Sequence, residues 1–193
     1  MNATVDSQSA STSDPASNLV DRIRILEAEC AIRDIAHCYC DAADRRDWER
    51  WLAVFHPGAT YNYIGIFNGL VTDLAKGVKA FFGHIPETHH HLGNIEIRVR
   101  GDRAFCQSYL TAHHLIPAAA PVKVFPAHRA GVDEDWWVGG RYFDELEYRD
   151  GRWGIVHRTG VHDWHRWDVV DARGFIRNPA DAPANIDGRL GEW

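Results

Sequence analysis

The sequence lacks three features that would point to a membrane, an export pathway or a nucleic acid. No apolar run approaches the ~18 residues of a membrane-spanning helix, and the N-terminus has neither the basic start nor the apolar core of a signal peptide. The net charge is -6 and the basic residues are interspersed with acids, so no basic face is expected to bind nucleic acid. We therefore expect a cytoplasmic protein with no membrane partner and no nucleic-acid partner.

Cysteine is also scarce, and none of the four cysteines has the Cys-x-x-Cys spacing of a metal site. They are Cys30, Cys38, Cys40 and Cys106, and all lie in segments with an apolar pattern. We predict reduced thiols buried in the core, because cytoplasmic thiols stay reduced. A chain of this size buries enough apolar surface to fold without a disulfide or a structural metal.

What the sequence does have is a globular composition, with 45% hydrophobic residues, 8 Trp and 12 His among 193 residues. We expect one domain over residues 18–165, preceded by a disordered tail at 1–17 and followed by an irregular extension at 166–193. The histidine excess is unusual. Imidazole gives and takes protons near neutral pH, so the histidines are candidates for acid-base chemistry.

Three segments have apolar residues at spacings of three and four, which predicts three helices. The first runs from Asn18 to Ala43, the second follows an N-cap at Asp47 and ends at 57–58, and the third lies within 72–83. Farther along the chain the period changes to two, which predicts strands.

One expected hairpin pairs residues 94–99 with 104–115, and a second pairs 137–148 with 153–164 through the turn at 150–151. Helices followed by meandering strands indicate an α+β fold. The expected architecture is a curved antiparallel sheet wrapped around helices, a cone-shaped α+β barrel whose central pocket is lined by aromatic residues.

Several short motifs occur in a characteristic order along the chain. They are Ala31-Ile32-Arg33-Asp34, Asp44-Arg45-Arg46-Asp47-Trp48, His91-Leu92-Gly93-Asn94, Gly139-Gly140-Arg141-Tyr142 and Arg149-Asp150-Gly151-Arg152-Trp153. Together they resemble the nuclear-transport-factor-2-like superfamily, in its SnoaL-like branch, over residues 19–164. The resemblance implies the fold and leaves the function open, because this fold hosts isomerases, dehydratases, hydrolases and non-catalytic subunits.

Within the superfamily, the chain resembles scytalone dehydratase, bile-acid dehydratase and hexachlorocyclohexane dehydrochlorinase, which are cofactor-free elimination enzymes. The resemblance places their catalytic Asp on Asp44 and their general acid-base His on His91. The scytalone dehydratase pattern adds Tyr63 and His113 as groups that polarise a substrate oxygen. The bile-acid dehydratase pattern adds Tyr39 as a substrate-binding candidate.

Further substrate-binding candidates lie on the last two expected strands. Tyr142 and Gly140 stand where scytalone dehydratase has an Asn and a Ser, so its substrate cannot be carried over. On the last strand, alternation places Arg158, His162 and Trp164 on one face. That face mixes polar and aromatic side chains, which is typical of a pocket wall.

Plainer interpretations exist for several of these residues. Asp44 projects well off the apolar stripe of its helix and can be read as a solvated residue at the helix end. Alternation places His91 on the opposite strand face from His90, and loop surface is the favoured interpretation of His90. For His113, a pocket role and a structural role are both open. Its neighbour His114 faces the opposite side of the strand, and one of the two should face inward. Tyr39 can equally be a core aromatic residue.

The main functional hypothesis is a cofactor-independent lyase, most simply a dehydratase, acting on a small hydroxylated aromatic or polycyclic compound through an Asp44–His91 pair. The same pocket could break a carbon-carbon bond of an aryl diol or move a double bond. Two alternatives are a non-catalytic protein, either ligand-binding or similar to a dioxygenase small subunit, and a metal-dependent hydrolase built on the histidine cluster. We expect no cofactor, no metal and a homo-oligomer, dimer or trimer.

Overall fold

The computed structural model describes residues 15–170, with side chains from residue 18. Three helices and six strands follow in the order α1 (Pro15–Arg45), α2 (Trp48–Ala53), β1 (Phe55–Tyr63), β2 (Phe67–Leu70), α3 (Val71–Phe82), β3 (Glu87–Arg100), β4 (Arg103–Ile116), β5 (Glu134–Arg149) and β6 (Arg152–Val169). The expected tail at 1–17 is described only from residue 15, where α1 begins, and the expected C-terminal extension only to residue 170.

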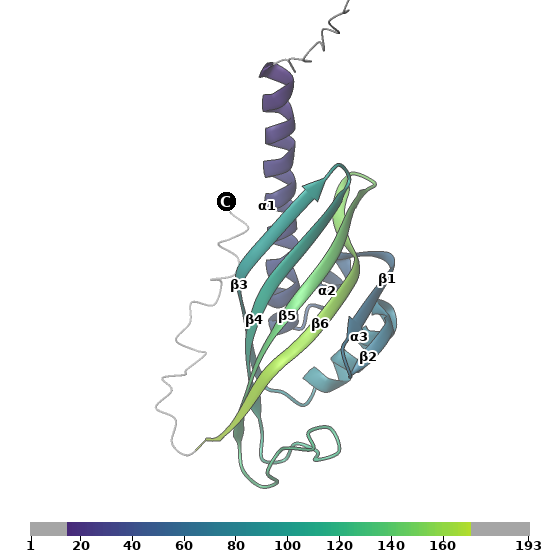
Figure 1. Ribbon diagram of the computed structural model, residues 1–193. Coiled ribbons are helices and arrows are strands. Elements are labelled where there is room, and N and C mark those ends of the chain that lie inside the picture. The colour runs from purple at the N-terminus through teal and green to yellow at the C-terminus, as the bar shows by residue number, and fades with distance from the viewer. Residues whose placement is uncertain (1–14, 171–193) are drawn as a thin grey trace, which may run out of the picture.

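The six strands form one curved sheet in the order β2-β1-β6-β5-β4-β3, and the helices lie against one of its faces (Figure 1). The expected α+β class is therefore confirmed. One detail differs from the expected sheet, because β1 runs parallel to β6 while every other pair is antiparallel. The N-terminal half of α1 extends beyond the end of the sheet (Figure 1).

A stripe of small and apolar residues fixes how α1 packs on the sheet. Ala28, Ile32, Ala36 and Ala43 are buried and recur at helical spacing along one side. The helix ends at Arg45. The next residue, Arg46, has a left-handed φ of 59°, and the N–H of Asp47 bonds back to the carbonyl of Ala42 at 2.9 Å. This end places the last turn of α1 against β3.

The second helix begins at the predicted N-cap, because the Asp47 carboxylate accepts the backbone N–H of Arg50 at 3.1 Å. It ends at Ala53, earlier than expected. Residues 57–58 lie inside β1 and do not terminate the helix. Among the residues that the structure describes, no helix is both long and apolar enough to cross a bilayer.

Extra residues in two strands decide which side chains face the helices. In β3 the register shifts between Gly93 and Glu96, so one additional residue is inserted opposite β4, and Asn94 has a φ of 48°. In β6 the register shifts again, because His162 pairs with Gly140 whereas Trp164 pairs with Gly139. Each insertion reverses the alternation of the side chains beyond it.

The main core lies between α1, α2 and the concave face of the sheet. A smaller cluster of Ile85, Ile116 and Phe125 lies beneath the long β4–β5 connection. All four cysteines are free, as expected, and Cys106 is buried. The expectation that all are core residues is wrong for Cys30, which is exposed because it points away from the sheet.

Candidate active site

A pocket of about 530 Å³ opens between the helices and the sheet. Its walls are predominantly aromatic and aliphatic, with three histidines and four tyrosines as the polar groups. The lining residues are Tyr39, Ala43, Trp51, Tyr61, Tyr63, Ile66, Phe67, Leu74, Gly77, Val78, Phe81, Phe82, His90, Leu110, Ala112, His114, Trp136, Val138, Tyr142 and His162.

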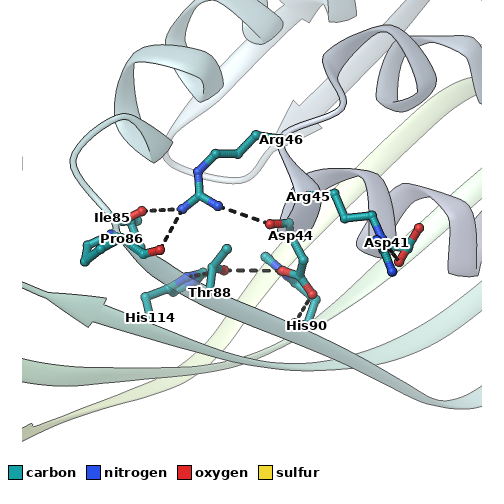
Figure 2. Close-up of polar contacts among 9 residues, drawn as sticks. All are labelled: Asp41, Asp44, Arg45, Arg46, Ile85, Pro86, Thr88, His90 and His114. Atoms are coloured by element: carbon teal, nitrogen blue, oxygen red, sulfur yellow. Dashed lines mark hydrogen bonds and ion pairs between the residues drawn. The ribbon is translucent and has the colours of Figure 1, made fainter. Parts of the chain in front are cut away.

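Asp44, in the last turn of α1, forms a two-point contact with His90 on β3. The Asp44 Oδ1 atom lies 2.6 Å from His90 Nδ1, and Oδ2 accepts the backbone N–H of His90 at 2.8 Å (Figure 2). The His90 side chain is 8% exposed and the Asp44 side chain is 21% exposed. An ionised carboxylate only accepts hydrogen bonds, so His90 Nδ1 is the donor.

Arg46 fixes the end of α1 relative to the start of β3. Its guanidinium donates to the backbone carbonyl oxygens of Ile85 and Pro86 and, at 3.1 Å, to that of Asp44 (Figure 2). These bonds join the helix end to the segment that leads into β3. The Arg46 side chain therefore bridges backbone carbonyls of the two segments that carry Asp44 and His90.

Thr88 extends this network to a second histidine, His114 on β4. The Thr88 hydroxyl lies 3.4 Å from Asp44 Oδ1 and 2.8 Å from His114 Nδ1 (Figure 2). A hydroxyl has one proton, so a Thr88 that donates to Asp44 must accept from His114 Nδ1. Both histidines then have Nδ1–H facing the network and an unprotonated Nε2.

Burial keeps His114 in the neutral form. Its exposed fraction is 4%, and the loss of solvation lowers its pKa well below the usual value, with smaller contributions from His90 and His113. The ring also lies edge-on to His90, with 5.3 Å between centroids. The pocket therefore contains two adjacent imidazoles, and that of His114 is a neutral hydrogen-bond acceptor at Nε2.

The prediction that Asp44 pairs with His91 is wrong, because the histidine that contacts Asp44 is His90. His91 is exposed on the outer face of the sheet, opposite Thr111 of β4, while His90 makes the contact with Asp44. The inserted residue at Asn94 is the physical reason, because it reverses the alternation between the two ends of β3.

The predicted pocket role of His113 is also contradicted, because its neighbour His114 lines the pocket. His113 lies on the outer face, 2.5 Å from the carboxylate of Asp135 and with its ring 4.7 Å from that of Trp137. Successive strand residues point to opposite faces, so one of the two histidines had to face outward.

Tyr39, Tyr61, Tyr63 and Tyr142 line the pocket away from the histidines. Burial raises the pKa of Tyr39. Its hydroxyl contacts the hydroxyl of Tyr61 and the guanidinium of Arg158. Burial also raises the pKa of Tyr63 to about 12. These phenols stay protonated at neutral pH and can donate hydrogen bonds to a substrate oxygen.

Arg158 lies behind this tyrosine wall and is not among the lining residues. Its guanidinium carbon is 4.0 Å from the ring centre of Tyr39 and 4.3 Å from that of Tyr142. Its Nε and Nη2 donate to the Asp144 carboxylate at 2.6 and 2.7 Å. The predicted substrate-binding residue Arg158 therefore supports the wall from behind.

The two remaining candidates on β6 lie on different faces. His162 lines the pocket, whereas the predicted pocket residue Trp164 is half exposed on the outer face, over Gly139. The extra residue between them, Asp163, is the physical reason for this correction.

The lining residues that were not predicted from the sequence include His90, His114, Tyr61 and Trp136. The sequence did contain a signal for His90 and His114. Each is adjacent to a predicted histidine, and adjacent strand residues point to opposite faces of the sheet. Within residues 15–170, no group of three or more His, Cys, Asp or Glu side chains is arranged to hold a metal ion.

Solved structures share this fold at low sequence identity. They include a hexachlorocyclohexane dehydrochlorinase (LinA) type 2, with 19% identity, a TM-score of 0.62 and coverage of 81% of this chain and 97% of that one. A protein from Novosphingobium aromaticivorans assigned as a scytalone dehydratase has 22% identity, a TM-score of 0.59 and coverage of 86% and 99%. The Kfla4162 protein from Kribbella flavida has 18% identity, a TM-score of 0.61 and coverage of 74% and 95%.

A search of curated proteins gives no significant match. One protein-family model does match, and the match spans most of the fold, from α1 to β6. The SnoaL-like domain model matches residues 24–159, which include Asp44, His90 and His114. The chain therefore belongs to the SnoaL-like domain family, as its motifs and its fold both indicate.

Proposed function

We propose that this protein is a cofactor-free lyase in which His90 is the general acid-base and Asp44 orients it. The observation that carries the proposal is the Asp44–His90 contact of 2.6 Å at the wall of an aromatic pocket. A carboxylate bonded to Nδ1 fixes the histidine tautomer and stabilises the imidazolium that forms when Nε2 takes a proton. Such a pair has no evident purpose in a purely structural subunit.

The chemistry that fits is an elimination from a small hydroxylated substrate, aromatic or polycyclic. His90 Nε2 removes a proton from carbon, and the C–H electron pair forms the new double bond as the C–O bond breaks. The leaving hydroxyl receives that same proton from His90 Nε2 and departs as water, which returns the imidazole to its neutral form. Tyr63 and His114 line the same pocket and can interact with the oxygens of the substrate. Because Tyr63 stays protonated, it can donate a hydrogen bond to an oxygen on which negative charge accumulates.

The similar structures support a lyase in general terms. Two of them are described as a dehydrochlorinase and a scytalone dehydratase, and both names denote eliminations. The predominantly apolar walls, with few polar groups, suit a substrate with a hydrocarbon body and few oxygens. Retro-aldol cleavage of an aryl diol needs the same base and is the second reaction to screen.

The test compares two neighbouring histidines on opposite faces of one strand. A panel of hydroxylated bicyclic ketones and aryl diols is screened for the absorbance of a new conjugated double bond, and the best substrate is used with His90→Gln and His91→Gln. We expect at least a 100-fold loss of kcat/KM for His90→Gln and a loss of less than about two-fold for His91→Gln. Near-full activity of His90→Gln, with its fold intact by circular dichroism, would refute the assignment.

A further inference from the structure

Two buried nitrogens on the pocket wall have no hydrogen-bond partner among the described residues. They are Nε1 of Trp136, on β5, and Nε2 of His162, on β6. Both side chains line the pocket, and their ring centroids are 6.3 Å apart at an interplanar angle of 54°. Leaving a polar group buried and unpaired costs about 1–3 kcal/mol, so such atoms call for an explanation.

The chemistry of the two nitrogens is complementary. The indole Nε1–H of Trp136 is a donor and cannot accept. The ring of His162 is hydrogen-bonded to the backbone of Trp164, an interaction that raises its pKa and therefore favours the protonated form. A ring nitrogen that donates to a carbonyl has this effect, and because Nε2 is unpaired the donor is Nδ1.

Burial nevertheless lowers the pKa of His162 overall, so its ring is neutral at pH 7. A neutral imidazole with Nδ1–H has a lone pair on Nε2, which makes that atom an acceptor. One donor and one acceptor thus lie on neighbouring rings of the pocket wall.

We propose that Trp136 and His162 bind a hydroxyl group of the substrate, separate from the Asp44–His90 pair. A single hydroxyl can accept from Trp136 Nε1–H and donate to His162 Nε2. A carbonyl or ether oxygen can satisfy only Trp136, and an ammonium only His162. The inference deepens the proposed function, on which its use in catalysis rests, by naming the chemical class: compounds whose ring system has a second hydroxyl.

The position of this site along the wall sets where the hydroxyl lies. The ring of Trp136 is 5.1 Å from that of His114, which in turn is 5.3 Å from that of His90. Trp136 therefore lies beyond His114 from the reacting pair, and His162 lies beside Trp136. A fused-ring compound with oxygens at opposite ends matches this order better than a monocyclic one.

The experiment uses three aromatic compounds of similar shape and needs no turnover. They are 2-naphthol, which donates and accepts, 2-methoxynaphthalene, which only accepts, and 2-methylnaphthalene, which does neither. Affinities are measured by NMR titration of the indole resonances for the wild type, His162→Phe and Trp136→Phe. Both variants retain an aromatic ring at the substituted position. Each removes one of the two polar atoms, so either variant can still test its own hydrogen bond if the other fails to fold.

We expect 2-naphthol to bind the wild type about five-fold more tightly than 2-methoxynaphthalene, as one neutral hydrogen bond predicts, and His162→Phe to abolish that difference. Trp136→Phe should abolish the advantage of the methoxy compound over the methyl compound. Long-range proton–nitrogen spectra of the free protein should show Nδ1–H on His162.

Three results would overturn the inference. The first is a protonated Nε2 on His162, and the second is a direct hydrogen bond between Trp136 Nε1–H and His162 Nε2 that persists with 2-naphthol bound. The third is an equal affinity of all three compounds, including no binding of any. A failure of the proposed lyase function would appear differently, as absent turnover while the ranking of the naphthalenes persists.

Discussion

Asp44 holds His90 through both of its carboxylate oxygens, one on the imidazole and one on the backbone N–H of the same residue. The carboxylate therefore fixes the ring relative to its own main chain as well as choosing its tautomer. A substitution at Asp44 should reveal whether this arrangement has a catalytic purpose.

Asp44→Asn should lower kcat by about 100- to 10,000-fold, because the amide can donate to Nδ1 and so favour the tautomer with a proton on Nε2. The matched control is Asp41→Asn, one turn earlier on α1, where an exposed carboxylate is ion-paired with Arg45 and Arg50. Steady-state kinetics should show less than a two-fold change for the control. Equal losses in the two variants would assign the effect to the stability of α1.

The buried pair of Arg158 and Asp144 should contribute strongly to stability. Both side chains are almost fully buried, so Arg158→Met leaves an uncompensated carboxylate in the core and should cost about 3–5 kcal/mol in urea unfolding. The double variant Arg158→Met/Asp144→Leu should recover much of that loss. A double variant as unstable as the single one would show that the arginine acts through its stacking on the tyrosines instead.

His114 should make the protein less stable in mild acid. Its pKa is lowered in the folded state, so between that value and the unfolded value of about 6.5 the unfolded chain binds the extra proton. The free energy of unfolding then falls as the pH decreases below about 6.5. In His114→Gln the slope of that free energy against pH, measured by urea unfolding from pH 5.5 to 7.5, should decrease by up to one proton; an unchanged slope contradicts the prediction.

Gly140 should not tolerate a side chain. A Cβ at this position would lie 2.4 Å from the backbone oxygen of Val161, so β5 and β6 would have to separate at the insertion in β6. Gly140→Ala should lower the free energy of unfolding by about 1–3 kcal/mol. The control Gly93→Ala, whose Cβ would meet nothing within 4 Å, should change it by less than about 0.5 kcal/mol in thermal or urea unfolding.

The cysteines should differ sharply in reactivity. Cys30 is exposed, whereas burial raises the pKa of Cys40 and Cys106 to about 12 and keeps their thiols protonated. Iodoacetamide at pH 8 should modify Cys30 and spare Cys40 and Cys106 until urea is added, as peptide mass spectrometry would show. Early modification of Cys106 would mean that the sheet opens locally.

Helical periodicity was sufficient to predict α1, the N-cap at Asp47 and the region of α3, because each depends on contacts close in sequence. The strand β1 was largely missed. It contains Pro57 and Gly58, and one of its two partners is β6, which pairs in parallel through residues 97 to 100 positions later. A local pattern carries little information about such a pairing.

The site was predicted to within one residue at two histidines, for two different reasons. At His114 the sequence did not decide which of two adjacent residues on β4 faces inward, whereas at His90 an extra residue in β3 reversed the alternation. Ile95 and Ile97 are partly buried against the core, so the odd positions in that half of β3 face inward. On the other side of the insertion, Leu92 and His90 face inward instead. The position of a β-bulge could not be predicted from the strand sequence alone. The same effect moved Trp164 to the outer face.

The parallel pairing of β1 with β6 also has a consequence for the order of folding. The hairpins β3–β4 and β5–β6 close short loops, whereas β1 can join the sheet only after a loop of more than 90 residues has closed. Tyr61 and Tyr63 enter the pocket with β1. Among the walls of the cavity, the tyrosine side is therefore expected to form last, so a folding intermediate would contain the hairpins and lack a complete ligand site.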